Sequence, residues 1–327
     1  MIKKIAIIFI VILSFGLGLF VEKNFDTSQV SVIPDLASEN VRLGGYKYVS
    51  PLLECEQVEG LGGVNFNSLE SEIDSYIESK KAQKDLENAA VYFRQFRNGA
   101  WFGVNEREGY APASLLKVPI MMAYLKESED DDAILSEVIK FSGENKALDQ
   151  EFDPQEGLVK GESYTNLELL EKLIKYSDND ALYLLAQNLD EYKVSKLMED
   201  LGISSQGIGV AEDYMSVRSY ASLFRVLYNA SYLSKENSEK ALSFLANSAF
   251  SNGLRSGVPE NIEIAHKFGQ RDIVGEDLKQ LHDCGIIYHP NKPYLLCIMT
   301  RGYDYDVLSG IIGEISKKTY DTYSRVY

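Results

Sequence analysis

The stretch APASLLKVPIMMAYL, residues 111–125, places a serine and a lysine directly before a run of apolar residues. The run is apolar on nearly every helical face, so it predicts a buried helix. A serine at such a start is commonly an N-cap, which Glu or Gln often follows three residues later. Here Lys117 follows Ser114 at that distance. A lysine there opposes the helix dipole and costs desolvation beside a buried helix.

The pair Ser114 and Lys117 also has a chemical interpretation, which removes this conflict. Residues i and i+3 share a helix face, so the Lys117 amine is expected to reach the Ser114 hydroxyl. A lysine whose ammonium form is disfavoured by burial can act as a base and take the serine proton. The S-x-x-K pattern alone occurs by chance in many proteins, so its specificity is low.

Two later segments supply possible partners for this pair. The first is Ser177-Asp178-Asn179, and the second is His266-Lys267-Phe268-Gly269. Each also has a plainer interpretation, because the first would cap the next helix and the second would end a strand with a turn glycine. The order S-x-x-K, S-D-N and K-x-G is more specific, since it is the motif set of penicillin-recognising serine enzymes.

With these motifs, the chain resembles the class A β-lactamase family and the related D,D-peptidases from about Ser68 to Tyr323. The stretch CGIIYHPNKPYLL, residues 284–296, is similar to the penultimate hairpin of the family, and Thr300-Arg301-Gly302 precedes a final helix. The resemblance implies an α/β (α+β) fold. The pattern of the residues predicts the same architecture: an antiparallel sheet made from both chain ends, with an all-helical subdomain inserted between them.

The resemblance also implies a role for each motif residue. Ser114 would be the acylated nucleophile and Lys117 its base. Ser177 would relay a proton to the leaving nitrogen, and Asn179 would orient Lys117 and the substrate amide. Lys267 would attract the substrate carboxylate and disfavour the charged form of Lys117.

The oxyanion hole would consist of the backbone N–H groups of Ser114 and of Gln270, the residue after Gly269. Phe268, however, occupies the place where the family has Thr or Ser, so a hydroxyl that would bind the substrate carboxylate is missing.

Class A enzymes also carry a glutamate after the S-D-N helix that activates the deacylating water. Glu212 is the only glutamate in the short corresponding stretch, and a solvated surface carboxylate is its better interpretation. Acylation is therefore expected, but efficient β-lactam turnover is not.

The chain start predicts export. Lys3 and Lys4 precede the uncharged run Ile5–Val21, the pattern of a signal peptide or signal anchor, with an uncleaved anchor slightly favoured. We expect residues 1–22 to be this segment, 23–64 a tether and 65–327 the hydrolase domain. The domain would be extracytoplasmic, either membrane-anchored or secreted.

Composition excludes several classes. The chain has 327 residues and a formal net charge of −16, which disfavours a nucleic-acid or anionic-lipid binding surface. It contains three cysteines and three histidines, with neither C-x-x-C nor H-E-x-x-H, so we expect no metal and no cofactor. A monomer is expected.

The hairpin register raises one question about two of the cysteines. If Tyr288 pairs with Pro293, Cys284 and Cys297 lie opposite each other, close enough for a disulfide in some geometries. Two small buried residues are the commoner arrangement for cysteine and the favoured interpretation.

The predicted function is a serine hydrolase that acts on a β-lactam or on a cell-wall peptide ending in a D-amino acid, through an acyl-serine intermediate. One alternative is a D,D-peptidase-like wall enzyme with slow β-lactam turnover. Another is a catalytically silent, membrane-tethered binding module. The intact motif set favours an enzyme, because loss of catalysis would remove the reason to keep Lys117 in a costly position.

Overall fold

The computed structural model describes residues 46–50, 66–97, 99–143, 152, 156–203, 213–273, 275–290 and 292–326. All of them belong to one compact unit, Gly44–Tyr327. The predicted signal segment and most of the predicted tether lie outside the described residues. Within the described part of the chain, no helix is both long and apolar enough to cross a membrane.

The central element is a five-stranded antiparallel sheet in the order β2-β1-β7-β6-β5. Its strands come from both ends of the domain, as predicted: β1 (Leu86–Gln95), β2 (Trp101–Val104), β5 (Ile264–Asp272), β6 (Lys279–Ile287) and β7 (Tyr294–Gly302). Antiparallel ladders confirm both hairpins that turn residues in the sequence predict, β1–β2 around Arg97-Asn98-Gly99 and β6–β7 around residues 289–292. The motif strand β5 lies at one edge of the sheet.

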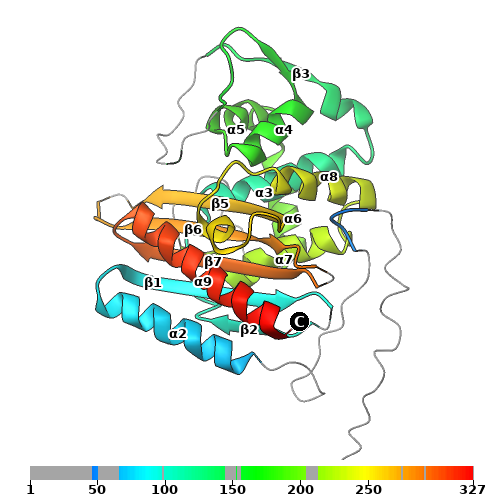
Figure 1. Cartoon of the computed structure of the whole chain (residues 1–327). Coiled ribbons are helices and arrows are strands. Elements are labelled where there is room, and N and C mark those ends of the chain that lie inside the picture. Colours follow the sequence, from blue (N-terminus) through cyan, green and yellow to red (C-terminus); the bar gives the residue numbers. More distant parts are fainter. Residues whose placement is uncertain are drawn as a thin grey trace, which may run out of the picture. The chain divides into compact units, whose positions relative to one another are not determined.

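Two helices cover one face of the sheet, α2 (Asn67–Ala82) and α9 (Tyr305–Val326), as Figure 1 shows. The stripe Leu69, Ile73 and Ile77 of α2 is fully buried, as its helical spacing predicts. Apolar side chains of both helices form one core with residues of that sheet face.

The region between β2 and β5 is mostly helical, and its part up to α8 builds the second core on the opposite face of the sheet (Figure 1). It also contains two short paired strands, β3 (Val138–Lys140) and β4 (Ser163–Thr165), which were not predicted. Its helices are η1 (Ala113–Leu116), α3 (Lys117–Glu127), η2 (Asp132–Ser136), α4 (Asn166–Lys175), α5 (Asn179–Ala186), α6 (Glu191–Asp200), α7 (Val217–Tyr228), α8 (Lys235–Ala246) and η3 (Gly253–Gly257). Every residue of α3 from Lys117 to Leu125 is buried, which confirms the predicted buried helix.

The two hairpin cysteines form a disulfide, so the favoured interpretation of two unlinked buried residues is wrong. The predicted register is confirmed, because Ile287 pairs with Tyr294 and Cys284 therefore lies directly opposite Cys297. Direct opposition on neighbouring antiparallel strands brings the two side chains together. The strand register therefore predicted the disulfide correctly, whereas the high frequency of unlinked buried cysteines in proteins did not.

A short piece of the predicted tether packs against the domain. The Glu239 carboxylate of α8 accepts hydrogen bonds from the backbone N–H groups of Lys47, Tyr48 and Val49, at 2.7–3.1 Å. The Ser50 N–H donates to the carbonyl of Tyr228 at 2.7 Å. Residues 46–50 are therefore held on the helical side of the domain.

Candidate active site

The predicted nucleophile lies in a tight turn between the sheet and α3. Ser114 belongs to the 3₁₀ helix η1, and the α-helix begins only at Lys117. The Ser114 side chain is half-buried and makes no capping hydrogen bond, so it is not an N-cap. The preceding residue, Ala113, has φ of 48°, a conformation that costs a non-glycine residue about 1–3 kcal/mol. Strain of this kind concentrates at functional sites.

The Lys117 amine joins the first two motifs. Its side chain is only 1% exposed, and Nζ donates to the carbonyl oxygen of Ser177 at 2.5 Å and to its Oγ at 3.1 Å. A third hydrogen bond reaches Asn179 Oδ1 at 2.7 Å. These three acceptors occupy the three donors of an ammonium group. Among the described residues, the expected hydrogen bond between Lys117 Nζ and Ser114 Oγ is not formed, because the amine is directed at the S-D-N segment.

Burial gives this amine the properties of a base. Desolvation lowers the pKa of Lys117 from 10.5 to about 7, and the charge of Asp178 opposes the decrease. A lysine with a pKa near 7 is a neutral amine in about half of the molecules at that pH. It can therefore accept a proton, which a surface lysine at neutral pH rarely does.

The residues of the S-D-N segment make two kinds of contact, one with α5 and one with Lys117. Asp178 caps α5, because its Oδ1 accepts hydrogen bonds from the backbone N–H groups of Asp180 at 2.7 Å and Ala181 at 3.1 Å. Ser177 and Asn179 instead turn towards Lys117, and Ser177 has φ of 55°. The helix-cap interpretation of this segment is confirmed for Asp178, and the catalytic roles of Ser177 and Asn179 stay predictions.

The third motif contributes a second buried lysine. Lys267 is fully buried in β5, and its Nζ donates to the Phe268 carbonyl oxygen at 2.8 Å. Its pKa lies well below the ordinary value, first because of burial and then because of the charge of Lys117. The Lys267 and Lys117 amines therefore repel one another when both are charged.

The departure at Phe268 has a structural role that the motif does not reveal. Its ring is 3% exposed and stacks on Phe250 with 4.1 Å between ring centres. Phe152 packs edge-on against it at 6.1 Å, and Lys267 Nζ lies 4.3 Å from its ring centre. An aromatic cluster thus fills the surroundings of the residue where the family has a hydroxyl.

Strand β5 approaches η1 closely at Gly269. A Cβ added there would lie 3.0 Å from the Pro112 carbonyl oxygen and 3.1 Å from the Leu115 nitrogen. Only glycine allows this approach without displacing the turn that carries Ser114. Gln270 is half-buried, and its Oε1 accepts a hydrogen bond from the Phe152 N–H at 3.3 Å. Its backbone role in an oxyanion hole stays a prediction.

Three side chains that no motif identifies hold the nucleophile turn in place. The Tyr220 hydroxyl of α7 donates to the Leu115 carbonyl at 2.9 Å. The Gln280 Oε1 of β6 accepts from the Ala111 N–H at 3.1 Å, and His282 Nε2 lies 3.0 Å from the Ala111 carbonyl oxygen. Burial lowers the pKa of His282 to about 4, so the neutral ring donates from Nε2. These contacts join residues far apart in the chain and left no local sequence signal.

Glu212 lies outside the described residues. Its neighbour Asp213 accepts hydrogen bonds from Gln280 Nε2 at 2.8 Å and from Arg301 at 2.5 Å. His266 comes directly before Lys267, and this position predicts a place at the edge of the site. It is instead buried, with Nδ1 2.9 Å from Asp283 Oδ1. Successive residues of a strand point to opposite faces, so His266 faces away from the side of Lys267.

Comparison with known proteins gives a consistent result. Residues 68–323 match the model of the beta-lactamase enzyme family. A mutant of PBP-A, solved as an acyl-enzyme complex with penicillin G, is 22% identical with a TM-score of 0.65, over 79% of this chain and 97% of that one. The TLA-3 extended-spectrum beta-lactamase is 19% identical with a TM-score of 0.69, over 79% and 99% of the two chains.

A beta-lactamase from Sphaerobacter thermophilus is 18% identical to this chain with a TM-score of 0.66, over 79% and 98% of the two chains. At these identities the structures establish the fold alone. No protein with a curated description matches the chain.

Proposed function

Because the chain belongs to the beta-lactamase enzyme family and is a β-lactamase-like serine hydrolase, we propose that Ser114 is acylated by a β-lactam or by a cell-wall peptide ending in a D-amino acid. The observation that carries this proposal is the buried Lys117 amine, hydrogen-bonded to Ser177 and Asn179 and with a pKa of about 7. Burial that lowers the pKa of a lysine to this range is typical of a catalytic base, and Lys117 lies one helical turn after Ser114.

The proposed acylation uses these groups in sequence. The neutral Lys117 amine takes the proton of Ser114 Oγ while Oγ bonds to the substrate carbonyl carbon, so the carbonyl oxygen gains the negative charge. The backbone N–H groups of Ser114 and Gln270 hold that oxygen. Ser177, within hydrogen-bond distance of Lys117, gives its hydroxyl proton to the leaving nitrogen and takes the proton that Lys117 had accepted, while the C–N bond breaks and the carbonyl forms again. The product is an acyl-Ser114 enzyme.

We propose further that the acyl-enzyme is long-lived with β-lactams. The short stretch between Ile203 and Ser216 carries Glu212 as its only glutamate, and we assign no water-activating role to it. The buried Phe268 supplies no hydroxyl for a substrate carboxylate. Both features favour a D,D-peptidase-like wall enzyme with slow β-lactam turnover over an efficient β-lactamase.

The test is covalent labelling. The chain is incubated with a fluorescent penicillin, and the mass of the intact protein and of its peptides is measured over time. We expect an adduct on Ser114 that is released slowly, and no adduct on Ser114→Ala. Absence of label from the wild-type chain, with broad serine-directed acylating probes also silent, would overturn the proposal in favour of a binding module.

We also propose that residues 1–22 direct the domain out of the cytoplasm, either as a cleaved signal or as an anchor. The support is the pair Lys3 and Lys4 before the uncharged run Ile5–Val21. Fractionation of cells expressing the full chain, combined with protease added outside the membrane, tests this. The outer layers of the cells are removed while the cytoplasmic membrane stays intact. If the domain then resists the added protease, it lies inside the membrane, and export is contradicted.

A further inference from the structure

The backbone of Ala111, three residues before Ser114, is held at both of its polar groups by side chains of β6. Its N–H donates to Gln280 Oε1 at 3.1 Å, and its carbonyl oxygen lies 3.0 Å from His282 Nε2. All three residues are at most 1% exposed. Side chains two residues apart on a strand share a face, so one strand can hold both groups. The position of the nucleophile turn therefore depends on how these two side chains are oriented.

A side-chain amide needs a second contact to fix its orientation. The Gln280 amide has an oxygen that accepts hydrogen bonds and an NH2 group that donates them. If the amide turned over, its NH2 group would face the Ala111 N–H, and two donors would meet in a buried place. The neighbouring His282 has such a second contact, because its Nδ1 accepts from the Thr300 N–H at 3.3 Å and Nε2 then carries the proton towards Ala111.

Asp213 supplies the second contact for Gln280. Gln280 Nε2 donates to Asp213 Oδ1 at 2.8 Å, and an ionised carboxylate can only accept. The amide therefore has one favourable orientation, in which Oε1 faces the Ala111 N–H. A hydrogen bond to a charged acceptor is stronger than one between two neutral groups. The contact joins residues that are 67 positions apart in the chain.

The Asp213 carboxylate is fixed in turn by Arg301 of β7. The guanidinium donates to Oδ2 at 2.5 Å, so each carboxylate oxygen accepts a hydrogen bond. The same guanidinium nitrogen lies 3.4 Å from the Gly109 carbonyl oxygen, and the Arg301 side chain is 18% exposed. Arg301 thus connects the carboxylate to the chain that leads into the nucleophile turn.

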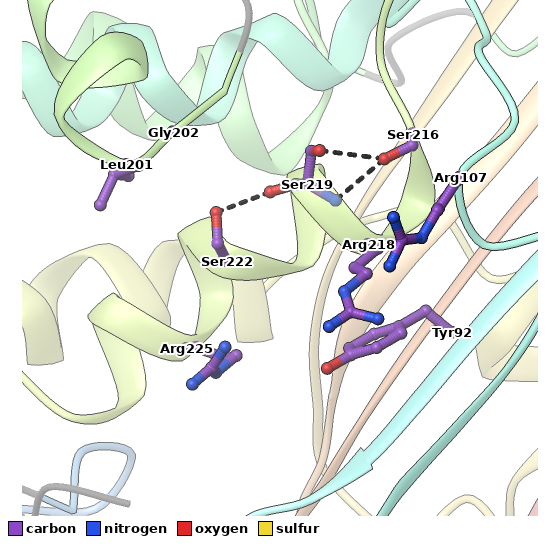
Figure 2. Close-up of a pocket in the computed structure, with 9 residues that line it drawn as sticks. All are labelled: Tyr92, Arg107, Leu201, Gly202, Ser216, Arg218, Ser219, Ser222 and Arg225. Carbon is purple, nitrogen blue, oxygen red and sulfur yellow. Dashed lines mark hydrogen bonds between the residues drawn. The ribbon is translucent and has the colours of Figure 1, made fainter. Parts of the chain in front are cut away.

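The backbone after Asp213 is anchored as well. Two residues later, Met215 exchanges both backbone hydrogen bonds with Tyr110, at 2.9 and 3.0 Å. Ser216 follows as the N-cap of α7, and its Oγ accepts from the Ser219 N–H at 3.1 Å, as a dashed line in Figure 2 shows. The carboxylate is therefore carried by a segment that is bonded to the chain directly before the nucleophile turn.

We propose that Asp213 is a positioning residue for Ser114 and acts through the Gln280 amide. The inference rests on the proposed acylation, because Ser114 is the group that is positioned. A shift of the Ala111 backbone displaces the 3₁₀ helix η1 that follows, and a small displacement of a reacting group lowers a rate strongly. Asp213 therefore affects the rate constant of acylation, whereas substrate affinity, which we assign to Lys267, stays the same.

The first test exchanges the two polar groups. Gln280→Glu places a second carboxylate against that of Asp213, and we expect acylation by a fluorescent penicillin to slow at least about tenfold. Adding Asp213→Asn supplies an NH2 donor for the new carboxylate, so the double variant should recover to within about threefold of the wild type. Asp213→Ala, which leaves the Gln280 NH2 group without its acceptor, should be about tenfold slower and serves where Gln280→Glu does not fold.

The measured quantities are the acylation rate constant at saturating penicillin and the penicillin concentration at half-saturation. A positioning role lowers the rate constant and leaves the half-saturating concentration unchanged, which a general loss of structure would not do. Asp321→Asn is the matched control, because it removes the acid of an exposed ion pair with Lys317 in α9. It should change neither quantity. Circular dichroism establishes that each variant is folded.

Hydrogen exchange tests the contact with Ala111 without any substrate. In peptides that contain Ala111, measured by mass spectrometry on the full chain, Asp213→Ala should speed exchange at least about tenfold. If the wild type takes no label, this faster exchange still supports the hydrogen-bond chain, and only the proposed acylation fails. A folded Asp213→Ala with unchanged exchange and labelling would overturn the inference, as would a double variant as slow as Gln280→Glu.

Discussion

At the scale of single residues, the proposed acylation depends on Lys117. Its burial costs free energy, because water no longer solvates the ammonium group, and three acceptors from Ser177 and Asn179 compensate only in part. The same burial brings the pKa to about 7, so the cost and the catalytic property have one physical origin.

The pH dependence of acylation follows from that pKa. We expect the acylation rate to rise with pH through about 7, because only the neutral amine can accept the Ser114 proton. Asp178 favours the ammonium form, so Asp178→Asn should move the midpoint to lower pH while asparagine retains the helix cap. The midpoint of the acylation rate against pH is measured by stopped-flow labelling with a fluorescent penicillin. The range from about pH 5 to about pH 9 covers the titration of Lys117.

Asp180→Asn is the control for this shift. Asp180 lies in the same helix, but burial and the charge of Asp178 set the pKa of Lys117, so the midpoint of Asp180→Asn should equal that of the wild type. A midpoint that stays at the same pH in Asp178→Asn would show that another group limits the rate.

At the scale of elements, the contact between β5 and η1 sets the geometry of the nucleophile turn. Gly269→Ala would add a methyl group 3.0 Å from the Pro112 carbonyl and must push the turn away. We expect the acylation rate to fall about tenfold or more, because small displacements of reacting groups are costly. The measurement is the labelling rate, with urea unfolding to follow stability.

Gly310→Ala provides the matched glycine control. Gly310 lies in α9, and an added Cβ has no neighbour within 4 Å. This substitution should leave the labelling rate unchanged and stabilise the helix by about 0.5–1 kcal/mol. Equal labelling rates for both variants would mean that the β5–η1 contact does not position Ser114.

A second prediction at this scale concerns the aromatic cluster beside the K-x-G motif. Phe268→Thr restores the family residue but removes a buried ring stacked on Phe250. We expect it to lower the free energy of unfolding by about 3 kcal/mol, measured by urea denaturation. Phe268→Leu, which keeps most of the volume, should cost clearly less. A Phe268→Thr variant as stable as the wild type would show that the ring contributes little to the core.

At the scale of the whole molecule, the domain extends into the segment before α2. Glu239 binds three successive backbone N–H groups of residues 47–49, so this segment and α8 stabilise each other. We expect a chain that starts at Asn65 to be less stable than one that starts at Gly44, by about 1–3 kcal/mol from these charged hydrogen bonds.

The control for this prediction is a double-mutant comparison. Glu239→Ala should destabilise the chain that starts at Gly44 and have little effect on the one that starts at Asn65, because the partner is already absent there. Thermal unfolding of the four proteins measures the coupling. Equal effects of Glu239→Ala in both chains would place the role of Glu239 within α8 itself.

Local patterns were sufficient for much of the fold and for the identity of the motif residues. The stripe of α2, the buried run of α3 and the β6–β7 register follow from spacing alone, because periodicity reports which face is buried. The motifs also identified Lys117, Ser177 and Asn179, which the fold brings together at one amine. The paired strands β3 and β4 were missed because three residues are too few to show a period.

The sequence by itself identified the residues to which we assign acyl transfer, since that assignment depends on side-chain chemistry and on motif order. Only the tertiary structure decided how they are supported. Tyr220, Gln280 and His282 hold the nucleophile turn from distant elements, Phe268 is committed to an aromatic cluster, and Cys284 is bonded to Cys297. The physical reason is that burial and contact between distant segments arise when the chain packs, and the free energy of a buried lysine, ring or thiol depends on those neighbours.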